Sequence, residues 1–335
     1  MKHEKAKNAP KYPPPPLSPP RVNQDHFLVK GKTGKRLAAI LEQMIISASR
    51  RTDIPAYYSD WFCKRINEGF VSTRNPMNFN QTREITLSPD IVDCIVFWSK
   101  NPEPLIAKLD VVKDYAYYFQ FTLNSYGSDV EVNLPAKSKR IETFMKLSDK
   151  IGCQKNQKII WRYDPILLND IYTIDYHIDN FGETALKLRG YTQKVIFSFI
   201  DFYKKIEANI THLKIKPFDD DDKNKIAKNF SVIAESNGFL IETCAESIDL
   251  SSYGISHARC IDYELISRIK NCGTDIVKIN KDKNQRPECG CAAAVDIGFY
   301  NSCQNACLYC YANSSAAAVK KNITAHNQFS PMMIG

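Results

Sequence analysis

Short runs of apolar, β-prone residues recur along the chain from about residue 36, and stretches with a helical pattern separate many of them. The runs predict strands at residues 45–49, 94–98, 116–122, 158–163, 195–200, 239–243 and 294–298, with an eighth candidate at 276–279. Residues 138–150 and 223–237 are predicted helices, and the second ends before Gly238, where a C-terminal cap would lie. Buried strands that alternate with helices are typical of parallel βα units. The chain is therefore predicted to form an α/β fold, either a complete or partial (β/α) TIM-like barrel or an open doubly wound sheet.

The net charge of +8 is concentrated at one end of the chain. Nine lysines and arginines against two acids in residues 1–40 account for +7 of it, so the remaining body is close to neutral. A folded nucleic-acid-binding protein concentrates basic charge on its body, which makes a nucleic-acid partner unlikely here. No run approaches the roughly 20 apolar residues that span a bilayer, and the N-terminus is polar. A cytoplasmic protein without a membrane partner is expected.

Charged side chains follow five of the predicted strands. Because the carboxyl ends of parallel barrel strands converge on one mouth, where active sites are built, we expect these side chains to meet there. Guanidinium groups match carboxylates and phosphates, so the basic members would bind an anionic substrate, and the acids would orient them. The candidates for these catalytic roles are Arg50, Arg51, Asp53, Lys100, Arg162, Asp164 and Asp201.

The cysteines carry the most specific signal in the sequence. Eight of the eleven follow residue 240, and clustered cysteines in a cytosolic chain indicate metal binding or catalysis. Cys303, Cys307 and Cys310 form a Cys-x3-Cys-x2-Cys motif with Tyr309 before its last member. Three such thiolates can hold three corners of a [4Fe–4S] cluster and leave the fourth iron open. Structural zinc takes four ligands, so the triad suits zinc less well.

At these residues the chain resembles the radical S-adenosylmethionine superfamily, whose signature has this spacing and an aromatic residue at the position of Tyr309. The resemblance implies that the open iron chelates the methionyl amino and carboxylate groups of S-adenosylmethionine. Reduction by a donor such as flavodoxin or ferredoxin then breaks a carbon–sulfur bond and releases a radical. The same resemblance gives Tyr309 and Asn313 as cofactor-binding residues. In most members the cysteine loop follows the first barrel strand, whereas here it follows the last, which implies a circularly permuted barrel or a different α/β fold.

The chain as a whole is similar to a family of uncharacterised bacterial proteins that contain a domain of unknown function. The shared motifs are ISASRRTDIP at 46–55, WSKNP at 98–102, RYDP at 162–165 and CLYCYAN at 307–313. The similarity covers roughly residues 44–333, and the family implies no particular substrate.

A second group of cysteines, Cys244, Cys260, Cys289 and Cys291, offers four further thiolates. Four thiolates complete either an auxiliary [4Fe–4S] cluster or a tetrahedral zinc site, and the alternative is that some of them are unligated thiols. Gly290 would let the chain turn tightly enough for both neighbours to face one metal. Cys272 could replace one member. Cys63, Cys94 and Cys153 lie in apolar surroundings and are expected to be core residues.

These signals predict three parts and one function. Residues 1–35 are expected to be a disordered, proline- and lysine-rich extension, residues 36–285 the barrel, and residues 286–335 an iron–sulfur segment packed on it. The prediction is a radical S-adenosylmethionine enzyme that acts on an unidentified anionic small molecule. Two alternatives stay open: an iron–sulfur electron carrier or redox sensor, and a nucleic-acid repair enzyme that resembles the photoproduct lyases.

Overall fold

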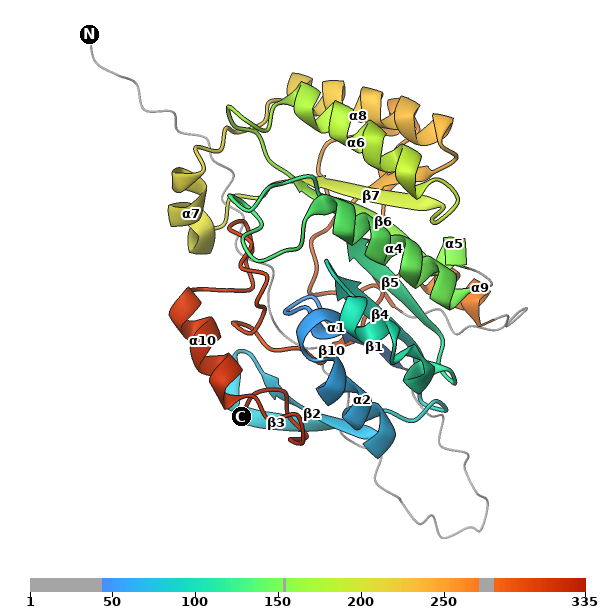
Figure 1. The fold of residues 1–335 in the computed structure, drawn as a ribbon, viewed down its shortest axis with the longest axis vertical. Helices are drawn as coiled ribbons and strands as arrows, with labels where there is room; N and C mark the ends of the chain where they lie inside the picture. The colour runs from blue at the N-terminus through green and yellow to red at the C-terminus, as the bar shows by residue number, and fades with distance from the viewer. Residues whose placement is uncertain (1–43, 153–154, 271–279) are drawn as a thin grey trace.

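An eight-stranded parallel sheet forms the centre of the molecule (Figure 1). The computed structural model describes residues 44–152, 155–270 and 280–335. Across the sheet the strands follow the order β10-β1-β4-β5-β6-β7-β8-β9, and every neighbouring pair is parallel. The strands are β1 (Met44–Ala48), β4 (Val92–Ser99), β5 (Tyr117–Thr122), β6 (Ile159–Ile166), β7 (Lys194–Phe199), β8 (Leu240–Thr243), β9 (Ser256–His257) and β10 (Val295–Asp296).

The predicted α/β class is confirmed, and seven of the predicted strands overlap observed ones. The eighth candidate at 276–279 and the extension at 1–35 lie outside the described residues. In the part of the chain that the structure describes, no pairing joins the edge strands β9 and β10. The sheet there is therefore open and does not form a complete barrel. From β1 onward the strand order follows the sequence, without the reversal of a doubly wound sheet.

The helices lie mainly in the connections between the strands (Figure 1). They are α1 (Ile54–Tyr57), α2 (Ser59–Glu68), α3 (Glu103–Ile106), α4 (Lys137–Ile151), α5 (Lys155–Lys158), α6 (Ile174–Leu188), α7 (Glu207–His212), α8 (Asp220–Ser236), α9 (Tyr263–Ile269) and α10 (Ala316–Ala325). Helix α8 begins with a capping box between Asp219 and Asp222. It ends before Gly238, whose φ of 73° is the left-handed conformation that glycine tolerates. In the described residues no helix is long and apolar enough to cross a membrane.

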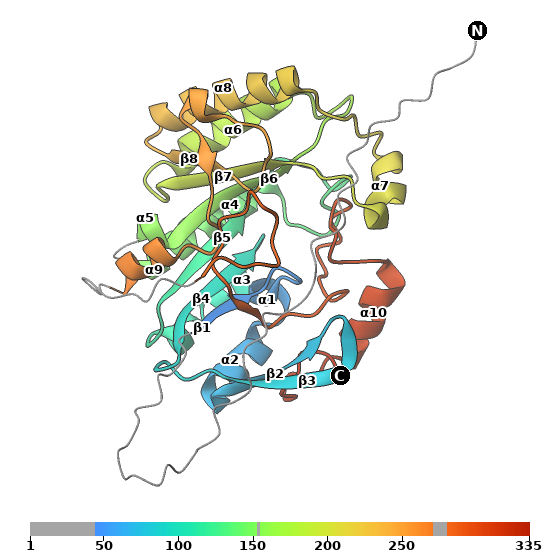
Figure 2. The ribbon, with the colours of Figure 1, turned by 180° about the vertical axis from the view of Figure 1, so that it is seen from behind.

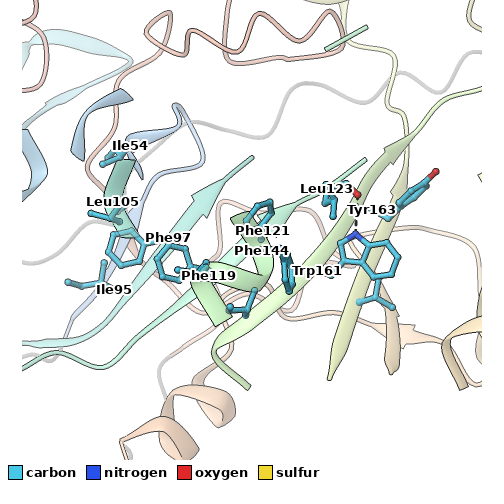
Figure 3. Packing of buried hydrophobic residues seen from close by; sticks show 14 of the residues in the cluster. Ile54, Ile95, Phe97, Leu105, Phe119, Phe121, Leu123, Phe144, Trp161 and Tyr163 are labelled. Carbon is cyan, nitrogen blue, oxygen red and sulfur yellow. Dashed lines mark hydrogen bonds between the residues drawn. The ribbon is translucent and has the colours of Figure 1, made fainter. Parts of the chain in front are cut away.

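Alternate residues of each strand face opposite sides of the sheet, and both sides are buried. Phe97, Phe119 and Trp161 point toward the side covered by α4, α6 and α8, where the rings of Phe97 and Phe119 stack with centroids 4.7 Å apart (Figure 3). The indole nitrogen of Trp161 donates to the carbonyl of Leu123 at 3.0 Å. Burial on both sides explains why the strands read as continuous apolar runs.

The opposite side of the sheet is covered by α9 and the segment that precedes β10 (Figure 2). Cys94, Val96 and Tyr118 of the strands pack there against Leu265 and Ile266 of α9. This side also contains several cysteines of the second group. The prediction that Cys94 is a core residue is confirmed, because it is fully buried.

A hairpin that the apolar pattern did not predict extends from the main sheet. It consists of β2 (Phe70–Asn75) and β3 (Asn78–Thr86), which are antiparallel. The backbone of Ser72 donates to Pro331 at 2.9 Å, so the hairpin contacts the C-terminal residues. Most side chains of β3 are exposed, and for this reason the strand lacks an apolar signature.

Candidate functional site

The loop that carries the three cysteines begins directly after β10, at the carboxyl end of the sheet. Asp296 joins it to β1: its carboxylate accepts from the Ser47 hydroxyl at 2.9 Å and from the Arg50 backbone at 2.8 Å. Gly298 follows, and a Cβ there would lie 2.1 Å from the Oγ of Ser49. Glycine is therefore required by close packing between the loop and the end of β1.

The three cysteines of the Cys-x3-Cys-x2-Cys motif lie in one short loop, although among the described residues no three His, Cys, Asp or Glu side chains are arranged as a set that could hold a metal ion. Cys303 and Cys307 are buried and Cys310 is partly buried; Cys310 helps to raise the pKa of both other thiols, and Cys303 helps to raise that of Cys307. Burial raises the pKa of Cys303 to about 12, with further contributions from Asp53 and Cys310. Ala306 has a φ of 53°, a left-handed conformation that costs a residue with a Cβ roughly 1–2 kcal/mol. Such strain is often concentrated at functional sites.

Asp53, a predicted site residue, connects the ends of two strands to the cysteine loop. Its carboxylate accepts from the Ser99 hydroxyl at 2.7 Å, the Lys100 backbone at 2.8 Å and the Asn305 side chain at 3.0 Å. Burial raises the pKa of Asp53 above its usual value, although these hydrogen bonds act in the opposite direction. Because its donors come both from the end of β4 and from the cysteine loop, Asp53 holds the loop in position.

Glu131 is a second connection, which the sequence did not reveal. It is 1% exposed, and its carboxylate is 2.9 Å from both the Lys100 ammonium and an Arg140 nitrogen. The hydroxyl of Tyr309 also donates to it. Burial alone would raise the pKa of Glu131, but the two cations lower it below its usual value. Glu131 lies nine residues beyond the end of β5, in a segment that reads as an ordinary acidic loop, so no pattern indicated it.

The same segment pairs with the cysteine loop through its backbone. Glu131 and Cys307 form an antiparallel bridge, and Leu308 donates to the carbonyl of Val130 at 2.9 Å. Asn133 adds a side-chain bond to the carbonyl of Gln304 at 2.8 Å. The loop is thus held on one side by the end of β1 and on the other by the connection between β5 and α4.

Arg162 and Asp164, both predicted site residues, form a close ion pair on β6. Ser198 donates to the same Asp164 carboxylate. Arg162 and the Ser198 hydroxyl outweigh the effect of burial and lower the pKa of Asp164. A nitrogen of Arg162 also lies 2.9 Å from the Sγ of Cys260. The guanidinium expected to bind an anionic substrate is therefore already engaged by groups of this chain.

The remaining predicted residues differ in how firmly they are held. Asp201 is exposed and pairs with Arg286, with one contact of 3.1 Å. The Arg51 guanidinium contacts the carbonyl of Gly298 at 3.4 Å and Asp296 at 3.9 Å, and it lies over the ring of Tyr300 at 5.2 Å from the centroid. The side-chain nitrogen of Asn313 donates to the backbone carbonyl of Cys303 at 2.8 Å, whereas its Oδ1 is buried without a hydrogen-bond partner. Arg51 and Asn313 thus keep unused hydrogen-bonding capacity near the loop.

The second cysteine group also converges, on the side of the sheet that α9 covers. The Sγ atoms of Cys244 and Cys260 are 3.4 Å apart, and the backbone of Ile261 donates to the Sγ of Cys291 at 3.5 Å. Gly290 is not in the left-handed conformation. Its absent side chain instead makes room for Arg259, whose Cγ would lie 2.9 Å from a Cβ. Cys272 lies outside the described residues, as does Cys153.

Neither of two surface cavities formed by the described residues is lined by a cysteine of either group. A cavity of about 410 Å³ lies between the α1–α2 region and residues 326–329, and another of about 350 Å³ lies near Leu168 and Lys216. Two tyrosines that line the first cavity contact the cysteine loop: Tyr58 donates to the carbonyl of Ser302 at 2.6 Å, and Tyr57 donates to Asn305 at 2.7 Å. The reactive and charged side chains that converge at the cysteine loop, rather than the shape of the surface, indicate a site there.

A family model for a domain of unknown function, DUF1848, matches residues 45–312. The chain belongs to the DUF1848 family. The match includes the sheet, both cysteine groups and the connection that contains Glu131, so these features lie within the family domain. The resemblance to an uncharacterised family is thereby confirmed. No curated protein and no solved structure matches the chain.

Proposed function

We propose that this DUF1848 protein is a radical S-adenosylmethionine enzyme whose [4Fe–4S] cluster is bound by Cys303, Cys307 and Cys310. The observation that carries the proposal is the position of the three cysteines, two of them buried and one partly buried, in a short loop fixed at the carboxyl ends of parallel strands. That edge of a parallel sheet is where substrates and cofactors bind in α/β enzymes.

The donor set fits the cluster. Three thiolates occupy three corners of a cubane and leave one iron for a ligand from outside the protein. Lys100 is near enough to Cys307 to lower the pKa of that buried thiol, which burial raises. A cation there would partly offset the negative charge of bound thiolates. When bound, such a cluster supplies an electron that breaks a carbon–sulfur bond of S-adenosylmethionine.

The strand order supports a partial, circularly permuted barrel. Strand β10, which leads into the cysteine loop, is the neighbour of β1 at one edge, and β4, β5, β6 and β7 follow in sequence order. Read across the sheet, the strand with the cysteine loop comes first, as it does in the superfamily that the motif resembles. A permutation moves a strand along the sequence without moving it in the sheet, and this accounts for the C-terminal position of the motif.

The residues around the loop divide into those that fix it and those free to bind. Asp53, Lys100 and Glu131 are fully engaged with one another and with the loop, so their role is to hold it and exclude water. Tyr309 is held by the Glu131 carboxylate at the position proposed for adenine. Asn313 presents an unpaired acceptor for the cofactor, and the weakly held Arg51 is the proposed site for an anionic substrate.

Product analysis tests the proposal. The anaerobically reconstituted chain is mixed with S-adenosylmethionine and dithionite, and mass spectrometry is used to look for 5′-deoxyadenosine or for the product of cleavage at the other carbon–sulfur bond. Changing any one of the three loop cysteines to alanine should abolish cleavage and the charge-transfer absorption of the cluster. Cys63→Ala, in helix α2, is the matched control and should retain both.

Two results would count against the proposal. If the variant that lacks all three loop cysteines still cleaved the cofactor, the loop could not hold the catalytic cluster. If the intact protein held a reducible cluster and never cleaved the cofactor, it would instead be an electron carrier or redox sensor.

A further inference from the structure

Three separate segments bring four thiols together on the side of the sheet that α9 covers. Cys244 follows β8, Cys260 follows β9, and the other two lie in the segment before β10. Cys260 and Cys291 are each 2% exposed and Cys289 is 6% exposed. The contact between Cys244 and Cys260, with Sγ atoms 3.4 Å apart, is accompanied by hydrogen bonding of Cys291 to both Cys260 and Cys289. The four thiols therefore form one connected group.

Two guanidinium groups, the buried one of Arg162 and the partly exposed one of Arg50, face these thiols. Arg162, which is 4% exposed, approaches the Sγ of Cys260 to 2.9 Å. Arg50 lies close enough to Cys291 for each to shift the pKa of the other. Both guanidinium groups lie over the ring of Trp98, at 5.4 Å for Arg162 and 5.7 Å for Arg50. The second cysteine group thus lies beside two positive charges.

The two guanidinium groups would complement the negative charge of thiolates bound to a metal. A guanidinium has only donors, and a neutral thiol is a weak acceptor for them. A thiolate bound to metal is deprotonated outright, and it accepts from an arginine as a charged group does. A cluster with four thiolates is negative overall, so two neighbouring arginines would offset its charge.

We propose that a second [4Fe–4S] cluster is bound by Cys244, Cys260, Cys289 and Cys291. The site depends on these residues alone and stands whether or not the three-cysteine loop cleaves S-adenosylmethionine. Because the protein supplies all four ligands, no iron of this cluster is open to a small molecule.

A cluster and a single zinc ion make different demands on the spacing of these thiols. Within residues 44–152, 155–270 and 280–335, no three His, Cys, Asp or Glu side chains form a set that could hold a metal ion. A cubane does not need its thiolates to share one centre, because its own irons and sulfides separate them. A cubane at this site would require Cys244 and Cys260 to lie further apart than 3.4 Å, and both lie in segments outside the helices and strands. Ala258 and Ala292 pack in the same cluster of side chains and occupy little volume.

A chain of hydrogen bonds joins this group to the three-cysteine loop. Arg162 contacts Cys260 and pairs with Asp164. The backbone of Asp164 donates to Asn124 at 2.8 Å, and the amide of Asn124 donates to the Tyr309 hydroxyl at 3.1 Å. Tyr309 immediately precedes Cys310. The two cysteine groups are therefore connected through side chains of adjacent strands.

Iron and acid-labile sulfide counts on four reconstituted full-length chains test the proposal. The wild-type chain should hold about eight irons, and about four should remain in a loop variant with Cys303, Cys307 and Cys310 changed to alanine. A Cys260→Ser, Cys291→Ser variant should also hold about four. Cys94→Ala removes a buried cysteine from the same side of the sheet and should keep the wild-type count.

The loop variant gives the decisive spectrum. Its reduced cluster should show an electron paramagnetic resonance signal that S-adenosylmethionine leaves unchanged, because that cluster has no open iron. One zinc per chain and no iron in the loop variant would overturn the proposal, and so would the absence of any metal. This test does not require the Cys260/Cys291 variant to fold, and failure of cofactor cleavage in the wild-type chain would leave its result intact.

Discussion

The two cysteine groups are built in opposite ways. Cys303, Cys307 and Cys310 lie within eight consecutive residues, whereas Cys244, Cys260, Cys289 and Cys291 come from segments that span 48 residues and become neighbours only in the fold. The first group is held from outside by two buried carboxylates, Asp53 and Glu131. The second is flanked by two arginines, of which Arg162 is buried and Arg50 is partly exposed.

This difference has a physical consequence for the stability of each group. Local spacing already gives the loop its three ligands, and the surrounding protein only has to orient it. The second group has no local scaffold, so its geometry depends on the packing of α9 and the segment before β10 against the sheet. Changes at the loop's anchors should therefore disturb one group and spare the other.

The largest effect is expected for Glu131→Gln. The change removes the carboxylate shared by Lys100 and Arg140, and loss of one partner from a buried ion pair typically costs about 3–5 kcal/mol. Urea unfolding should show a loss of that size, and iron should be lost from the three-cysteine loop alone. Glu183→Gln breaks surface pairs of a carboxylate that is 52% exposed and should cost less than about 1 kcal/mol. Equal losses in both variants would contradict the role of Glu131.

Acid should loosen the scaffold that both groups share. His177 is fully buried behind β6, between the Tyr163 hydroxyl and the carbonyl of Leu167. Burial lowers its pKa from 6.5 to about 4, so the folded chain binds fewer protons than the unfolded chain between these values. The stabilisation is complete above pH 6.5 and is lost as the pH falls toward 4, by roughly 3 kcal/mol.

Urea unfolding at a series of pH values measures this loss, and histidine hydrogen–deuterium exchange gives the pKa of His177 directly. His177→Gln cannot titrate and should have a flatter profile. A wild-type stability that stayed constant from pH 6.5 to 4 would show that His177 does not govern the acid response.

Gly298→Ala is a steric test of the loop alone. The new Cβ would lie 2.1 Å from the Ser49 hydroxyl oxygen, so the loop has to move away from β1. Overpacking of this kind typically costs 1–3 kcal/mol, and the expected loss is about that size. Gly182→Ala in helix α6 would meet only Ile233 at 3.7 Å and should leave stability unchanged or slightly raised. Loss of iron from the second group in Gly298→Ala would mean that the groups are not separable.

The smallest effects are expected for glycine replacements beside each of the two cysteine groups. Ala306, in the cysteine loop, and Ala245, next to Cys244, have left-handed backbones with φ of 53° and 55°. Replacement by glycine relieves the Cβ contact but adds unfolded-state entropy, so each change should stabilise the chain by about 0.5 kcal/mol. Ala227→Gly inside helix α8 should destabilise it by about 1 kcal/mol. Differential scanning calorimetry measures all three changes, and destabilisation by either left-handed replacement would contradict the assigned strain.

Much of the fold could be predicted from the sequence, because it depends on neighbouring residues. Apolar runs indicated the strands that are buried on both sides, and Asp219 and Gly238 mark the ends of α8. The exposed hairpin β2–β3 lacks an apolar pattern and was not predicted. Whether the sheet closes depends on the pairing of its edge strands, and a local sequence pattern does not encode that pairing.

The sequence by itself determined the three-cysteine motif, since a spacing of a few residues already limits how far apart the thiols can lie. It also placed Asp53 at the end of the first strand. Only the tertiary structure brought Glu131 to Tyr309, joined Arg162 to Cys260 and gathered the second group. The first two contacts join residues 178 and 98 positions apart, and the second group comes from segments that span 48 residues. The hydrophobic packing of these segments, which no local pattern encodes, decides which contacts form.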